Sequence, residues 1–361
     1  MIKIQNKIGF AIAIVLVVAA ILLLGTSPKG ASASNGLAGS NLQGGAQNST
    51  DMAGNILYPK APELAGISGY INAPQNLTLA SLKGKVVLVD FWTYSCINCI
   101  RTLPYLESWY QKYGKDGFVI VGVHTPEFDF EKNYSNVQAA VAKFGITYPV
   151  VQDNDYATWN AYGNQYWPRH YLLDAQGRVH EDHIGEGGYD QTETEIVALL
   201  SEAKSQKVEM NATAPNVSGT QFDKIQSPEL YFGHDTRRQA LGNANPTAVG
   251  DIFNASVQGA MNPNVAYLEG TWQDNSDSAL LVSGTGAVDI DFSAGQVNIV
   301  AGSRTGSPIE AKAYVDGSLV QTFNITGQRL YTAAEVPQYG QHTIRIVFES
   351  PDVELYTFTF G

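Results

Sequence analysis

The two cysteines of this 361-residue chain, Cys96 and Cys99, are three positions apart and directly follow an apolar run. A Cys-x-x-Cys pair that enters a helix can form and break its own disulfide, because the helix N-terminus and the nearby second sulfur favour the thiolate, which is the attacking species. A permanent disulfide is one alternative, although closing so short a loop would stabilise the fold by only about 2 kcal/mol. Half of a metal site is another, but it needs further ligands at matching spacing. The pair therefore favours redox chemistry.

The two sulfurs are expected to have different roles. Cys96 is nearer the expected helix start, so its thiolate should attack a partner disulfide, and Cys99, one turn further in, should resolve the mixed disulfide. Asp90 lies six residues before Cys96 in a run that is otherwise apolar. Burial there would raise the pKa of its carboxyl and make it a proton acceptor for Cys99. The alternative is an acid that pairs with a lysine or a hydroxyl under the helix.

Alternating strands and helices are expected to position these residues between 56 and 205. The apolar run 86–89 is typical of a central strand that is covered on both faces, and apolar residues recur at helical spacing after Cys96. The other expected elements are a strand over 118–123, a helix over 137–144 that ends at Gly145, a hairpin over 171–174 and 179 onward, and a helix over 193–203.

A different pattern begins after residues 206–228, which are rich in Asn, Thr, Ser and Pro and are expected to be a linker. In 229–361 the hydrophobic period changes to two, and Asp316-Gly317 is a strong hairpin signal. Many short alternating segments with Gly-rich turns predict an antiparallel β-sandwich or jelly-roll domain.

The N-terminus suggests export. Residues 1–25 contain an apolar run behind two lysines, which predicts a single membrane-anchoring helix with the rest of the chain outside the cytoplasm. The alternative is a cleaved signal peptide, since Ala31-Ser32-Ala33 offers a small-residue cleavage site and would give a secreted protein. Residues 26–55 are rich in small and polar residues and are expected to be a flexible linker. The net charge of −12 argues against nucleic-acid binding.

Several segments resemble one known family. The amino-acid sequence resembles that of the TlpA/DipZ branch of exported thiol–disulfide oxidoreductases, which have the thioredoxin fold. The similar segments are 92–99, 123–128, 148–155, 166–174 and 185–189. Residues 229–361 resemble the carbohydrate-binding-module-like β domain that follows thioredoxin in DipZ proteins. The expected fold class is therefore an α/β thioredoxin fold, with a mixed sheet flanked by helices, followed by an antiparallel β-sandwich or jelly roll and preceded by a single transmembrane helix.

The resemblance also implies roles for individual residues. Pro168 resembles the cis-proline that faces the sulfurs, and Trp167-Pro168 would offer a backbone edge to which substrate adds as a strand. Trp92 is expected beside the disulfide and in the docking surface, with a purely structural core role as the alternative. Glu127 resembles a glutamate that tunes thiol acidity, although a solvated loop acid would look the same. The resemblance supports the same proton-accepting role for Asp90.

The expected function is reduction or isomerisation of disulfides in exported proteins, without a cofactor. The uncharged dipeptide Ile97-Asn98 favours a reductant or an isomerase, because strong oxidants of this fold stabilise the thiolate more. The expected electron donor is a membrane protein of the CcdA/DsbD kind. A copper metallochaperone on the same fold is the alternative, since thiolates suit Cu(I). The β domain could bind a glycan through four aromatic side chains, which would otherwise be core residues: Trp272, Tyr331, Tyr339 and Tyr356.

Overall fold

The computed structural model describes residues 49–50, 56–210, 215 and 220–361. The expected membrane anchor (1–25) and most of the expected linker 26–55 lie outside these residues. A short two-stranded ladder within them joins β1 (Ser49–Thr50) to β2 (Ile56–Leu57). None of the helices in the described ranges is long and apolar enough to cross a membrane.

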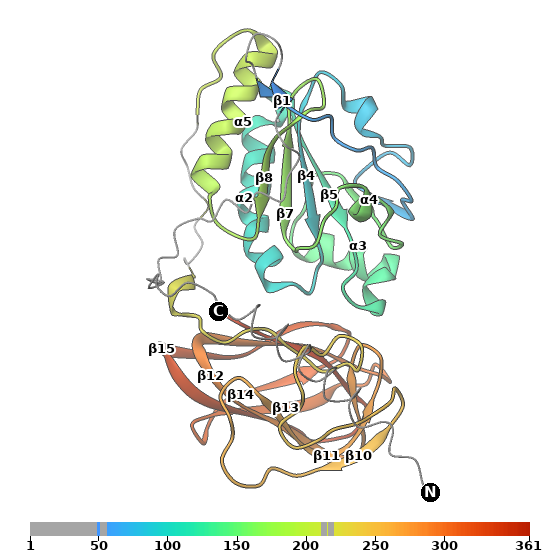
Figure 1. Cartoon of the computed structure of the whole chain (residues 1–361), viewed down its shortest axis with the longest axis vertical. Coiled ribbons are helices and arrows are strands. Elements are labelled where there is room, and N and C mark those ends of the chain that lie inside the picture. Colours follow the sequence, from blue (N-terminus) through green and yellow to red (C-terminus); the bar gives the residue numbers. More distant parts are fainter. Residues whose placement is uncertain (1–48, 51–55, 211–214, 216–219) are drawn as a thin grey trace, which may run out of the picture. The chain divides into compact units, whose positions relative to one another are not determined.

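The first domain is built around a six-stranded mixed sheet with strand order β3-β6-β5-β4-β7-β8 (Figure 1). β4 and β5 are parallel, as are β5 and β6, whereas the remaining neighbours are antiparallel. Every residue of β4 and β5 is buried, as the apolar runs predicted for strands covered on both faces. The strands are β3 (Gly69–Ile71), β4 (Val86–Trp92), β5 (Phe118–His124), β6 (Val150–Gln152), β7 (Arg169–Leu173) and β8 (Val179–Ile184).

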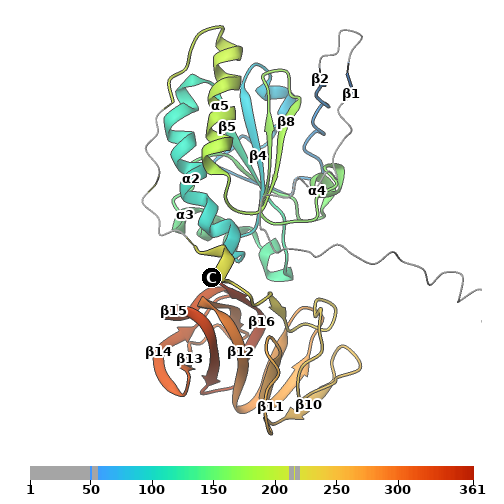
Figure 2. The same cartoon turned by 60° about the vertical axis from the view of Figure 1, so that its left-hand side comes forward.

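Helices cover both faces of this sheet, and Figure 2 shows α2, α3 and α5 on the side opposite α4. The first face packs Leu88 and Leu172 of the sheet against α2, α3 and α5, while the second packs Val89 and Phe91 against α4 and the 3-10 helix η1. The parallel β4-α2-β5 unit, followed by the antiparallel β7–β8 hairpin and α5, is the thioredoxin fold that was expected. The helices are η1 (Leu79–Leu82), α2 (Ile97–Tyr113), η2 (Gly114–Asp116), η3 (Asp129–Lys132), α3 (Tyr134–Lys143), α4 (Ala157–Ala161) and α5 (Tyr189–Lys204).

The predicted helices exist, but they begin earlier than the apolar periodicity indicated. α3 begins at Tyr134, because the side chain of Asn133 caps it by accepting a hydrogen bond from the backbone N–H of Ser135 at 2.9 Å. It ends where Gly145 takes a φ of +66°, which favours glycine. Apolar spacing detects the buried face of a helix and misses its polar first turn.

The C-terminal part is an eight-stranded antiparallel sheet domain with order β10-β11-β12-β15-β13-β14, in which β16 also pairs with β12 and with β9. β12 and β15 are 25 and 20 residues long and contain register shifts, so each takes part in two stretches of pairing. Asp316 and Gly317 both have positive φ and join β13 to β14, which confirms the predicted hairpin. The elements are η4 (Phe222–Lys224), β9 (Leu230–Tyr231), β10 (Ile252–Ala255), β11 (Ala266–Asp274), β12 (Ala279–Ser303), β13 (Ile309–Val315), β14 (Ser318–Ile325), β15 (Arg329–Phe348) and β16 (Val353–Phe360).

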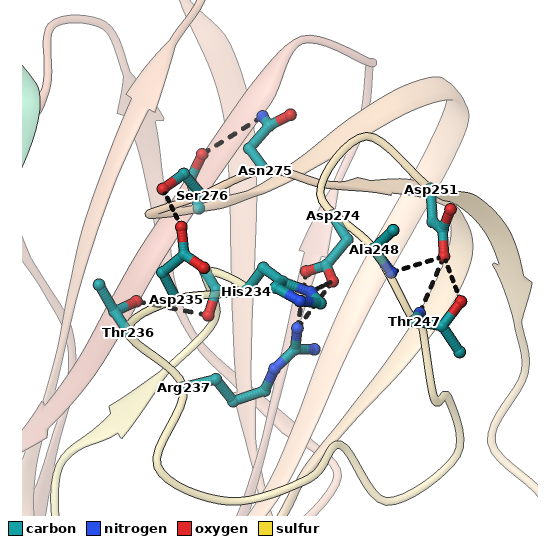
Figure 3. A network of polar contacts seen from close by, with 12 residues as sticks. His234, Asp235, Thr236, Arg237, Thr247, Ala248, Asp251, Asp274, Asn275 and Ser276 are labelled. Carbon is teal, nitrogen blue, oxygen red and sulfur yellow. Dashed lines mark hydrogen bonds and ion pairs between the residues drawn. The ribbon is translucent and has the colours of Figure 1, made fainter.

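A buried carboxylate joins the loop after β9 to the end of β11 (Figure 3). The Asp274 side chain is 1 % exposed and accepts hydrogen bonds from Arg237 Nη2 at 2.7 and 2.8 Å and from His234 Nδ1 at 2.7 Å. Because a buried charge needs partners of this kind, the network fixes the loop against the sheet. Its members satisfy one another, so we assign it a structural role.

Candidate active site

The two cysteines lie where β4 leads into α2. Cys96 is the N-cap residue of α2, and its sulfur accepts a hydrogen bond from the backbone N–H of Cys99 at 3.2 Å. Cys96 is 9 % exposed and Cys99 is fully buried, and both are free thiols in this structure. Only Cys96 offers surface to another molecule, as the attacking role predicted for it requires.

The environment of the Cys96 sulfur corrects one expectation. Burial raises the pKa of the Cys96 thiol, and the hydrogen bonds from Cys99 oppose this without overcoming it. The carboxylates of Glu127 and Glu229 raise the pKa of Cys96 further. The helix N-terminus was expected to favour the thiolate, but loss of water around the sulfur outweighs it. A nucleophilic thiol without a stabilised thiolate is typical of a reducing dithiol.

Asp90 is the buried acid that the sequence predicted. Its side chain is fully buried, and neither carboxyl oxygen has a hydrogen-bond partner among the described residues. Burial raises the pKa of Asp90 to about 8, and the pKa of Cys99 is raised by burial first, then by Cys96 and by the charge of Asp90. The predicted alternative, an acid paired with a lysine or a hydroxyl, is wrong. A carboxyl that ionises near pH 8 can accept and return a proton close to neutral pH.

The Trp167–Pro168 peptide bond is cis, as predicted. The half-buried Trp167 ring packs on Trp159 with 4.2 Å between centroids, and its Nε1 donates to the carbonyl oxygen of Thr125 at 3.1 Å. Trp167 lines a cleft of about 360 Å³ together with Ile97 and Asn98, the dipeptide between the cysteines. The backbone edge at Trp167–Pro168 remains a prediction for substrate binding.

Trp92 differs from its expected placement in the docking surface. Its side chain is fully buried and lies edge-on to His124, with 5.2 Å between ring centroids. A side chain without exposed area cannot form part of a docking surface, so Trp92 belongs to the core below the cysteines. It was predicted from its place next to the motif, but even positions of β4 point into the sheet–helix core.

Glu127 is not a solvated loop acid. Its Oε1 accepts a hydrogen bond from the hydroxyl of Tyr231 in β9 at 2.6 Å, and its backbone N–H donates to Glu131 Oε2 at 2.6 Å. Burial, followed by the charges of Glu229 and Glu131, raises the pKa of Glu127 to about 8. Since Glu127 and Glu229 both act on the Cys96 sulfur, residues of the C-terminal part contribute to the electrostatics of the site.

We expect Glu127→Gln to make Cys96 more reactive above neutral pH. The ionised carboxylate raises the pKa of Cys96, so its removal increases the thiolate fraction, and the effect should grow as pH passes about 8. Alkylation by iodoacetamide at pH 9 should become about 2- to 5-fold faster, measured in a Cys99→Ser background so that only Cys96 reacts. At pH 6, where Glu127 is protonated, the two proteins should react alike. A slower reaction at pH 9 would contradict this role.

Two further residues near the site were missed by the sequence analysis. Glu131 is fully buried and accepts hydrogen bonds from the Ser95 hydroxyl at 2.6 Å and from the backbone N–H groups of Glu127 and Phe128. Tyr231 lies 104 residues from Glu127 along the chain. Nothing in the local sequence distinguishes Glu131 from a surface acid, and no spacing rule connects two residues so far apart.

The aromatic side chains proposed for glycan stacking are largely core residues. Trp272, Tyr331 and Tyr356 are 0 %, 7 % and 4 % exposed. Tyr339 is half-buried, with the Lys224 ammonium 5.7 Å from its ring centroid. Within the described ranges, no three His, Cys, Asp or Glu side chains come together as a metal-binding group.

Comparison with protein families identifies the first domain. Residues 60–200 match the family model described as Redoxin. Residues 60–200 are a thioredoxin-like domain. Residues 227–361, the β-sheet domain, match the model described as "Thioredoxin like C-terminal domain".

Individual relatives agree with this assignment. The chain is 36% identical over 305 residues to Protein DipZ of Mycobacterium bovis, a match that covers 79% of this chain and 40% of that protein. It is 32% identical over 120 residues to the thiol-disulfide oxidoreductase ResA of Bacillus thuringiensis, covering 33% of this chain and 66% of ResA. A putative thiol:disulfide interchange protein DsbE from Chlorobium tepidum is 25% identical, with a TM-score of 0.35, over 40% of this chain and 96% of that chain. The thioredoxin-like domain is thus similar to ResA, a protein named for thiol–disulfide chemistry, and this chain spans less than half of DipZ.

Proposed function

We propose that this chain is a thiol–disulfide oxidoreductase that reduces or isomerises disulfides of exported proteins. The observation that carries the proposal is the pair of free thiols at the start of α2: Cys96 keeps 9 % of its surface exposed, and Cys99 is fully buried near an acid that ionises near pH 8. A dithiol exchange needs an attacking sulfur, which is on the more exposed of the two cysteines, a protected resolving sulfur and a group that takes a proton.

The reaction proceeds in two exchanges. The Cys96 thiolate attacks a substrate disulfide, which forms a mixed disulfide and releases one substrate thiolate. Cys99 then loses its proton to Asp90 and attacks the Cys96 sulfur, which releases the second substrate thiolate and leaves the Cys96–Cys99 disulfide. Two electrons pass from the dithiol to the substrate, and an external donor must return them.

The direction of electron flow is proposed to be reductive. Burial and the neighbouring carboxylates raise the pKa of the Cys96 thiol, so the reduced form has no stabilised thiolate to make the disulfide strongly oxidising. Equilibration with glutathione should give a reduction potential more negative than about −200 mV. A value near −120 mV, typical of the strong oxidant of this fold, would overturn the proposal.

We further propose that the apolar N-terminal run holds the chain at a membrane with its bulk outside the cytoplasm, where a donor of the CcdA/DsbD kind would re-reduce it. The apolar run behind two lysines supports this. Fractionation of expressing cells, with mass spectrometry of the mature N-terminus, tests it. Recovery in the cytosolic fraction would contradict both the anchor and the export of the chain.

A further inference from the structure

Three polar residues form a row across three neighbouring strands. Asp90 in β4 is directly opposite His170 in β7, and His170 is directly opposite His183 in β8. Residues that lie opposite each other in antiparallel strands point to the same face of a sheet. Leu88 and Leu172, two positions away in the same strands, pack with Cys99 in one cluster. The row therefore lies on the face that carries the resolving cysteine.

The members of the row approach one another without a completed hydrogen bond. His170 Nε2 is 3.6 Å from Asp90 Oδ1, and the rings of His170 and His183 are 6.1 Å apart at an interplanar angle of 71°. Both carboxyl oxygens of Asp90 and Nε2 of each histidine are buried without a hydrogen-bond partner in the described part of the chain. Buried polar groups are normally paired, so three consecutive unpaired groups call for an explanation.

The row has one buried end and one end near solvent. On the far side of Asp90 the opposite residue in β5 is Gly122, which has no side chain, and the rings of Trp92 and Tyr148 close the space there. At the other end, β8 is the outer strand of the sheet and His183 is half-buried. A Cβ at Gly188 would lie 2.9 Å from His183 Cε1, so glycine leaves room for the ring.

We propose that His170 and His183 carry the proton of Cys99 from Asp90 to solvent, which rests on the oxidoreductase function proposed above. When Cys99 attacks the Cys96 sulfur, its S–H proton passes to the Asp90 carboxylate. Asp90 must lose this proton before its carboxylate can accept another one in the next cycle. It passes to His170 Nε2, then from His170 to His183, and from His183 to water, while the leaving substrate thiolate takes a proton from solvent. No electrons move along the row.

The groups around the row support histidines that pass a proton on rather than histidines that hold a permanent charge. The titratable groups that bear on Asp90 from other elements are Cys99 of α2 and Tyr148 before β6, and His183 is near Glu181 of its own strand. Burial, followed by the charge of His183, lowers the pKa of His170 to about 3, so His170 rests as a neutral imidazole. A neutral imidazole accepts a proton on one nitrogen and donates from the other.

The test follows the two exchanges separately. Reduced full-length protein is mixed with 5,5′-dithiobis(2-nitrobenzoate) in a stopped-flow instrument. Attack by Cys96 releases the first thionitrobenzoate, and attack by Cys99 releases the second. At pH 7 the Asp90 carboxyl, with a pKa of about 8, is mostly protonated and must release its proton along the row before it can accept that of Cys99. In His170→Gln the second phase should therefore slow at least about 10-fold at pH 7, with the first phase within about 2-fold of wild type. His180→Gln is the matched control, because His180 is also in β8 but stacks on Tyr58 and pairs with Asp174.

His183→Gln gives a second, independent measurement in case the buried substitution prevents folding. Its second phase should slow several-fold and recover when imidazole buffer is added, since this end of the row is near solvent. A structural role would not produce recovery by buffer. Unchanged second phases, equal slowing of both phases, or slowing of His183→Gln without recovery would overturn the relay. Absence of a second phase in wild type would instead contradict the proposed function itself.

Discussion

Cys96→Ser is expected to abolish disulfide reduction, with the rate of insulin reduction falling to that of a reaction without protein. The serine hydroxyl cannot form the mixed disulfide, and Cys99 cannot replace it because its side chain is fully buried. Loss of a covalent nucleophile removes the whole reaction path rather than one interaction along it, so the expected loss is at least about 10³-fold. Turbidity of insulin with dithiothreitol as the reductant measures it.

Cys99→Ser is the matched variant, since it keeps the attacking sulfur and removes only the resolving one. It should lose turnover equally but accumulate mixed disulfides at Cys96, which mass spectrometry of non-reduced complexes would identify. Normal turnover by Cys96→Ser would contradict the mechanism. Turnover by Cys99→Ser would show that external thiols, not Cys99, complete the reaction.

The sequence predicted the structure best where a residue type or pattern occurs in only a few structural contexts. Cys96 and Cys99 lie at the start of a helix as predicted, because a Cys-x-x-Cys motif needs only local context. The cis bond before Pro168 is also present, but it was implied by the family resemblance and not by the local sequence. The strands 86–89 and 118–123 were found because fully buried strands are continuously apolar. Asp90 was identified for a related reason: an acid within such an apolar run must be buried, and burial raises the pKa of its carboxyl.

The sequence was least informative where a property depends on packing between distant residues. The direction of the Cys96 pKa is set by burial and by Glu127 and Glu229, which no local rule connects to the sulfur. His170 was a scattered histidine until the strand register put it opposite Asp90. Register is a property of the assembled sheet, and shifting it by one residue would turn the same side chain to the other face.

Asp90→Asn is expected to make the thioredoxin-like domain more stable at alkaline pH and a poorer reductant. The folded state raises the pKa of Asp90 from 3.8 to about 8, so between these pH values the folded chain holds a proton that the unfolded chain releases. Stability therefore falls as pH rises through this window, and an asparagine, which does not titrate, escapes the loss. The gain in free energy of unfolding should be small at pH 4 and reach roughly 3–5 kcal/mol above pH 8.

Urea unfolding followed by tryptophan fluorescence at pH 4, 6 and 8.5 measures this gain. Asp190→Asn, which changes an exposed acid in the first turn of α5, is the control and should show no gain that grows with pH. Equal stability of Asp90→Asn and wild type at pH 8.5 would mean that the folded chain accommodates the charge. Asp90→Asn is expected to reduce disulfides more slowly, because the amide cannot accept the proton of Cys99 and the attack by Cys99 becomes slower. The burial that makes Asp90 a base near neutral pH is the same burial that destabilises the fold, so stability and catalysis are opposed at this one side chain.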